Sequence, residues 1–100
     1  MTKDDKRWLE DVASLGCVVC RNIGYGATPA EVHHIRKGQG IAQRADHKKT
    51  LPLCPPHHRT GGHGVAIHAG QKSWEENYGT ETELLEQVTN EVKELRLCRI

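Results

Sequence analysis

The side chains with the clearest chemistry lie in two short segments, Cys17-Val-Val-Cys20 and Cys54-Pro-Pro-His57. Each segment carries two metal-binding side chains separated by two residues, a spacing at which both can face one tetrahedral ion. Three thiolates and one imidazole are an ordinary ligand set for structural zinc. We therefore expect a zinc ion to join the two segments. The alternative is that the cysteines are reduced and simply packed.

A pair of adjacent histidines, His33 and His34, lies between the two segments. β-branched residues flank the pair, which predicts a short strand whose successive side chains leave on opposite faces. The two imidazoles should therefore have different roles. We expect one imidazole to bind a metal and its neighbour to act on water as a general base, because a near-neutral pKa suits proton abstraction. Two ordinary surface histidines are the alternative.

Further histidines follow the second segment. His58 comes directly after His57, and one residue along a helix turns a side chain by about 100°, so His58 could face a second metal beside His33. The third ligand is expected from His63 or His68. We favour His68, which precedes a predicted helix, and expect His63, in a glycine-rich loop, to be exposed.

The chain of 100 residues fits one domain and carries a formal net charge of +1. That balance neither requires nor excludes nucleic acid, but basic residues gather in the central segment: Arg36, Lys37, Arg44, Lys48, Lys49 and Arg59. This segment is a candidate phosphate-facing surface, with Arg59, Lys48 and Lys49 as candidate DNA contacts. The alternative is a solvated loop. His47 lies among the lysines and is expected to be an exposed residue without a ligand partner.

No apolar run is long enough to cross a bilayer, and no apolar segment of a signal peptide follows the charged N-terminus. We expect a cytoplasmic protein that does not contact a membrane. Nothing marks the chain as secreted, so its four cysteines favour metal binding over disulfides. Cys98 lies apart from the others and is expected to be a partly buried free thiol.

The elements that must position these side chains follow from periodicity and capping signals. The sequence predicts a short amphipathic helix over 3–15, a loop over 22–29, a strand over 31–35 and an extended segment over 51–53. A short helix should begin at Pro55 and Pro56, and another should span 71–78 and end at Gly79. Thr80 and Glu83 form a capping box for a last helix over about 80–97. The fold class is a small α+β domain.

The order Cys17-Val-Val-Cys20, Val32-His33-His34-Ile35 and Leu53-Cys54-Pro-Pro-His57-His58-Arg59 resembles the HNH, or ββα-metal, endonucleases in their zinc-stapled form. The resemblance implies a metal core over about 17–74 with terminal helices around it. In that family a ligand and then a base end the first strand, here His33 and His34, and the final histidine follows the second zinc-binding pair, here His58.

Leu-Pro-Leu-Cys-Pro-Pro-His-His followed by Val-Ala-Ile-His is similar to the phage RecA-dependent nucleases of the Ref type, which implies DNA as substrate and a RecA-type recombinase filament as partner. The sequence departs from the HNH pattern in two ways. His57 replaces the usual second cysteine, which zinc tolerates. The middle Asn, which helps to orient the base in many members, is missing, since Lys49 and Thr50 stand before the second strand. This leaves open what holds His34, for which Thr50, Asp46 or a backbone carbonyl could serve.

The sequence thus predicts a metal-dependent endonuclease that hydrolyses DNA phosphodiesters, and nothing in it indicates sequence specificity. His33, His58 and His68 would hold one catalytic divalent ion, and their nitrogens favour Zn²⁺, Mn²⁺ or Ni²⁺ over Mg²⁺. The first alternative is a non-catalytic zinc-stabilised module that binds nucleic acid or protein. The second is a single metal site that combines the cysteines with His33 or His34.

Overall fold

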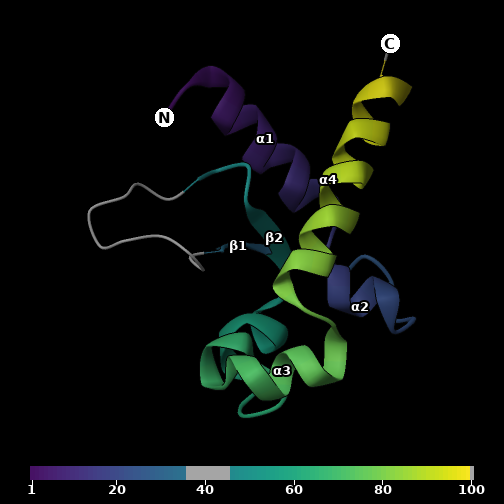
Figure 1. Cartoon of the computed structure of the whole chain (residues 1–100). Coiled ribbons are helices and arrows are strands. Elements are labelled where there is room, and N and C mark those ends of the chain that lie inside the picture. Colours follow the sequence, from purple (N-terminus) through teal and green to yellow (C-terminus); the bar gives the residue numbers. More distant parts are fainter. Residues whose placement is uncertain (36–45, 100) are drawn as a thin grey trace.

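Two helices from opposite ends of the chain lie against a small sheet in the computed structural model, which describes residues 1–35 and 46–99 (Figure 1). The elements are α1 (Lys3–Ser14), α2 (Val18–Asn22), β1 (Glu31–His34), β2 (Thr50–Leu53), α3 (Gln71–Tyr78) and α4 (Glu81–Cys98). Two short helical turns lie between β2 and α3: the π-turn η1 (Pro56–Thr60) and the 3₁₀ turn η2 (Ile67–Ala69). The fold is a small α+β arrangement, as predicted.

The sheet consists of β1 and β2, which pair antiparallel with His33 opposite Leu51 and His34 opposite Thr50. Pro52 is tolerated opposite Val32 because each strand of a two-stranded sheet has a free edge. All four residues of β2 are buried. In β1, His33 is buried whereas His34 is half-buried, so the expected alternation places the two imidazoles in different surroundings.

The core lies where α1 and α4 cover the sheet. Leu84, Val88 and Val92 recur every four residues along α4 and form its buried stripe. They belong to one apolar cluster with Trp8 and Val12 of α1, Leu51 and Leu53 of β2, and Trp74 of α3. Figure 1 shows α3 and the two turns together below the sheet, away from α1.

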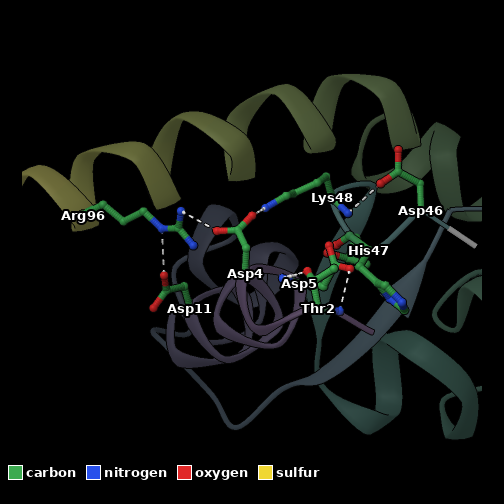
Figure 2. A network of polar contacts seen from close by, with 9 residues as sticks. Thr2, Asp4, Asp5, Asp11, Asp46, His47, Lys48 and Arg96 are labelled. Carbon is green, nitrogen blue, oxygen red and sulfur yellow. Dashed lines mark hydrogen bonds and ion pairs between the residues drawn. The ribbon is translucent and has the colours of Figure 1, made fainter.

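Ion pairs also join the two terminal helices (Figure 2). Asp11 of α1 is buried and accepts hydrogen bonds from Arg96 Nε at 3.0 Å and Arg99 Nη2 at 2.6 Å. Asp4 pairs with Arg96 at 3.8 Å and with the ammonium group of Lys48, which precedes β2. These contacts tie α1, α4 and the start of β2 into one polar network.

The ends of the long helices follow their local sequence. Capping boxes, Thr2 with Asp5 and Thr80 with Glu83, begin α1 and α4. Gly16 follows α1 with φ +79°, and a Cβ there would lie 2.8 Å from Ala27, so only glycine fits this close turn.

Most predicted elements are present, with small shifts in their ends. The helices expected over 3–15, 71–78 and about 80–97 are α1, α3 and α4, and the strand expected over 31–35 is β1. Helix α2 was not predicted. His68 lies in the 3₁₀ turn η2, just before α3.

Cys98 was expected to be partly buried but is exposed, because it lies at the end of α4 beyond the apolar cluster. No helix of the described residues is long and apolar enough to cross a membrane. The basic residues Arg36, Lys37 and Arg44 lie outside the described residues.

Candidate metal centres

A buried cluster of three cysteines and one histidine joins the first and second motifs. The ligand atoms of Cys17, Cys20, Cys54 and His57 all lie within 4.8 Å of one another. Cys20 Sγ is 3.7 Å from Cys54 Sγ, and Cys17 Sγ is 3.8 Å from His57 Nδ1. Tetrahedral zinc with Zn–S bonds of ~2.3 Å places neighbouring sulfurs about 3.8 Å apart. The donor set and its spacing therefore fit a structural metal such as zinc.

Different elements bring these four side chains together. Cys17 is the N-cap of α2 and its sulfur accepts a hydrogen bond from the Cys20 amide at 3.4 Å. Cys54 follows β2 directly, and His57 lies in η1. Trp74, which is fully buried in α3, donates its Nε1 hydrogen to the His57 carbonyl at 3.0 Å. The second half of the cluster is thus fixed by the core of the molecule.

Electrostatics in this cluster favour a cation between the four ligands. Burial raises the pKa of Cys54 to about 11, and burial lowers the pKa of His57. A buried thiolate is costly without a nearby positive charge, whereas a divalent ion stabilises the thiolate and displaces its proton. A neutral His57 already offers a lone pair for coordination.

A second cluster consists of His33, His58 and His68, whose ligand atoms also lie within 4.8 Å of one another. The three imidazoles come from β1, η1 and η2. His58 Nε2 lies 2.9 Å from His68 Nε2, and the His33 ring centre lies 5.2 Å from each of the other two. Burial lowers the pKa of His68, as do the charges of His58 and His33. The cluster runs from buried His33 to exposed His68, so it is open to solvent on one side.

Glu31 holds one imidazole of this cluster. His58 Nδ1 lies 2.9 Å from Glu31 Oε1. A hydrogen bond from Arg59 and then one from His58 lower the pKa of Glu31 to about 2. The ionised carboxylate can only accept, so His58 Nδ1 carries the hydrogen, and in the neutral ring the lone pair then lies on Nε2, which faces His68.

A carboxylate also contacts the second imidazole. His33 Nε2 lies 2.8 Å from Glu81 Oε2, and both side chains are almost fully buried. Glu81 is the first residue of α4. The terminal helix therefore reaches the cluster directly.

His34 points to a different partner. Its Nε2 lies 3.1 Å from His47 Nδ1, with the two rings edge to face. His47 is half-buried in the turn before β2, where Thr50 Oγ1 donates to its carbonyl at 3.0 Å. His47 was expected to be exposed, and that prediction is wrong because the turn folds back beside β1. Asp46 and Thr50 were suggested as supports of His34. Both form hydrogen bonds within the turn that carries His47: Asp46 Oδ1 accepts from the Lys48 amide, and Thr50 Oγ1 donates to the His47 carbonyl.

The model of a family described as "Recombination enhancement, RecA-dependent nuclease" matches residues 1–93. The chain belongs to this family. No curated protein matches the chain significantly. The family links the chain to nucleases that act in recombination, and the match covers α1 and most of α4 as well as both histidine-containing turns.

The structure of this RecA-dependent nuclease family member places most of the predicted site residues. Both predicted ligand sets, the first of three cysteines with His57 and the second of three histidines, come together. Of the two candidates for the third histidine, His68 lies in the cluster, whereas His63 is exposed with Nε2 3.4 Å from Ser73 Oγ.

The predicted DNA-contacting residues of the family member are less free than expected. Arg59 donates to both oxygens of Glu31, with Nη2 2.6 Å from Oε2. The ammonium group of Lys48 points at the Asp4 carboxylate (Figure 2) and lies 4.6 Å from the Trp8 ring centre. Lys49 is exposed. Two of the three cations are therefore already paired with carboxylates.

Sequence reasoning missed three residues that contact the histidines, namely Glu31, Glu81 and His47. Only Glu31 carried a local signal, since it lies two residues before His33 on the same face of β1. Glu81 looked like an ordinary first-turn acid of a helix, and His47 has no neighbour at ligand spacing. Their contacts depend on how distant elements pack.

Proposed function

We propose that the chain is a metal-dependent DNA endonuclease of the HNH type, which hydrolyses phosphodiester bonds and acts in recombination. The observation that supports this most is the trihistidine cluster of His33, His58 and His68, with a second imidazole pair, His34 and His47, that begins one residue further along β1. An open group of nitrogen ligands together with a candidate base is what metal-assisted hydrolysis needs. The residues Cys17, Cys20, Cys54 and His57 would hold a separate structural zinc ion.

His33, His58 and His68 would hold the catalytic divalent cation. When bound, such a cation supplies charge neutralisation for the scissile phosphate and its leaving oxygen. Three imidazole nitrogens favour Zn²⁺, Mn²⁺ or Ni²⁺ over Mg²⁺. The exposure of His68 leaves room on that side of the cluster for water and a phosphate group.

His34 would remove the proton from the attacking water. A neutral imidazole has one nitrogen with hydrogen and one with a lone pair. For His34 to accept a proton at Nδ1, its Nε2 must carry the hydrogen and donate it to His47 Nδ1, which lies 3.1 Å away. His47 would thereby take over the orienting role that the missing Asn has in the HNH pattern.

The DNA backbone would lie over the open side of the cluster. Lys49 is exposed and could contact phosphate directly. Arg59 and Lys48 would have to exchange the carboxylates of Glu31 and Asp4 for phosphate oxygens. Such exchange is inexpensive at exposed sites, where ion pairs contribute little.

The setting of the reaction is proposed from the family. We propose that residues 1–100 act as one HNH-like domain of phage or prophage origin, in the cytoplasm, on DNA that carries a RecA-type recombinase filament. The family description supports the link with a recombinase. Adding a recombinase filament to the cleavage reaction tests this partner: cleavage should depend on, or rise with, the filament.

Nicking of supercoiled plasmid with added Mn²⁺ tests the proposed function. We expect His34→Ala and His68→Ala to lower the cleavage rate by roughly 100-fold or more, because they remove the base and a ligand. His63→Ala is the matched control, since His63 is exposed outside the cluster and its loss should leave the rate unchanged. All three variants should melt at nearly the wild-type temperature.

The alternative, a non-catalytic zinc-stabilised binding module, predicts a different result. In that case neither wild type nor variants would cleave with Zn²⁺, Mn²⁺, Ni²⁺ or Mg²⁺, with or without a recombinase filament. Equal cleavage by wild type and His34→Ala would instead remove His34 as the base while leaving a nuclease.

A further inference from the structure

Glu81, the first residue of α4, carries a buried carboxylate. Its side chain is 5% exposed, and that of its partner His33 is 8% exposed. Burying such a pair costs free energy that its own attraction often fails to recover, so apolar residues of similar size usually serve stability as well. Stability alone therefore does not explain why Glu81 and His33 are paired at this position.

Three elements fix the position of the Glu81 carboxylate. Oε2 lies 2.8 Å from His33 Nε2 of β1, and Oε1 accepts a hydrogen bond from Gln71 Nε2 of α3 at 2.6 Å. The Glu81 amide donates to Glu75 Oε2 at 2.8 Å. The capping box of Thr80 and Glu83 sets where α4 begins. Both oxygens are thus satisfied, and the first turn of a helix favours negative charge.

The contact resembles the one on the other side of the cluster. Glu31 lies 2.9 Å from His58 Nδ1, and Glu81 lies 2.8 Å from His33 Nε2. Two of the three clustered imidazoles therefore each have one nitrogen against a carboxylate. In metal sites this arrangement fixes the orientation and tautomer of a ligand histidine and raises its basicity.

We propose that Glu81 is a positioning residue of the trihistidine metal site, which makes the first turn of α4 part of that site. The proposal deepens the proposed function and rests on it. In this role Glu81 would accept the hydrogen of His33 Nε2, and the other ring nitrogen would carry the lone pair for a cation. Gln71 holds the carboxylate in the orientation that this contact requires.

Cobalt binding tests the role of Glu81 without relying on nuclease activity. Full-length protein with zinc already in the cysteine cluster is titrated with Co²⁺, and binding is followed by visible absorption and calorimetry. His58→Ala identifies the signal of the trihistidine site. We expect Glu81→Ala to weaken Co²⁺ binding by roughly 10- to 100-fold, the usual effect of losing such a partner. Glu81→Gln keeps a hydrogen-bond acceptor and should lose less.

Glu86→Gln provides the matched control, because Glu86 is an exposed glutamate of the same helix. It should bind Co²⁺ as wild type does. The shape of the cobalt spectrum should stay the same in Glu81→Gln, since a positioning residue is not itself a ligand. If Glu81→Ala does not fold, Glu81→Gln, which has nearly the same shape, still gives the measurement.

The possible failures can be told apart. Unchanged affinity in both Glu81 variants would overturn the positioning role while leaving the metal site intact. An altered spectrum in Glu81→Gln would also overturn it, because it would make Glu81 a direct ligand. Equal Co²⁺ binding by wild type and His58→Ala would remove the trihistidine metal site itself, and with it both this proposal and the metal-dependent mechanism.

Discussion

Individual imidazoles in this molecule differ mainly in what holds their second nitrogen. His58 is held by Glu31, His33 by Glu81 and His34 by His47. A histidine held at one nitrogen offers the other in a defined direction, which is what ligation and proton transfer both need. These partners turn a group of exposed and buried histidines into an ordered site.

His47 should hold the ring of His34 in the orientation that proton abstraction needs. His47→Ala should lower plasmid cleavage by roughly 10- to 100-fold, because a misoriented base loses reactivity steeply with small displacements. His47→Asn, whose amide can still form a hydrogen bond to His34, should recover part of the rate. The melting temperature of both variants, followed by circular dichroism, should stay close to wild type. Unchanged cleavage in His47→Ala would show that His34 does not depend on this contact.

The sequence predicted the metal-binding side chains better than their supports. Spacing alone paired Cys17 with Cys20 and Cys54 with His57, since two-residue gaps bring ligands to one ion. The support of His33 comes from a residue 48 positions later in the chain. Such a contact follows from how α4 packs on the sheet, and no local pattern encodes it.

Among the elements, α4 has two tasks, since its apolar stripe closes the core while its first residue reaches the trihistidine cluster. Where it begins therefore matters for the site. Thr80 fixes that point, because its hydroxyl accepts a hydrogen bond from the Glu83 amide at 3.1 Å.

Removing this cap should cost stability. Thr80→Ala is expected to lower the free energy of unfolding by about 1 kcal/mol, the usual effect of losing an N-cap side chain. Thr82→Ala is the control, because Thr82 is exposed in the same turn and a substitution there should change stability by less than about 0.5 kcal/mol. Urea unfolding of the zinc-saturated proteins measures both. Equal losses in the two variants would contradict a specific capping role.

The longer elements could be read from the sequence, but the short ones could not. Periodic apolar residues and capping signals identified α1, α3 and α4 because each spans two or more turns. Helix α2 has five residues and follows Cys17, whose sulfur caps it. The 3₁₀ turn around His68 has three residues. Elements of this length are decided by tertiary contacts rather than by propensity.

For the molecule as a whole, the cysteine cluster should supply stability that a longer chain would gain from a larger apolar core. It joins residues 17–20 to residues 54–57, and a chain of this size buries too little apolar surface to be very stable without such a link. Its stability should therefore depend on the bound metal.

Cys17→Ser tests this dependence. The variant should lose its cooperative thermal transition, or melt far below wild type, and should release no zinc to a colorimetric chelator, whereas wild type should release zinc from this cluster and unfold as it does so. Cys98→Ser is the control, since Cys98 is exposed and outside the cluster. A Cys17→Ser protein that melts like Cys98→Ser would show that the cluster has no structural role.

The contact between the terminal helices should depend on pH. Burial raises the pKa of Asp11, but hydrogen bonds from Arg99 and then Arg96 outweigh this and bring it below its ordinary value of 3.8. A carboxyl with a depressed pKa adds stability above its unfolded-state pKa and loses it as pH falls below that value. The α1–α4 contact should therefore weaken in acid.

Asp11→Asn separates this effect from acid loss of metal, because both proteins keep the same cysteine cluster. Unfolding by urea should show the variant to be less stable near neutral pH. The difference should shrink as pH falls below 3.8, where wild type loses the same charge. A difference that stays constant with pH would contradict the role of the ionised carboxylate.

His57 and His58 are neighbours in the π-turn, and one faces the cysteine cluster while the other faces the trihistidine cluster. A single peptide bond therefore couples the two centres mechanically. We expect a change in the radius of an ion bound by His57 to shift the backbone that also carries the ring of His58. A structural ion would in this way also adjust the spacing of the three imidazoles in the proposed phosphate site.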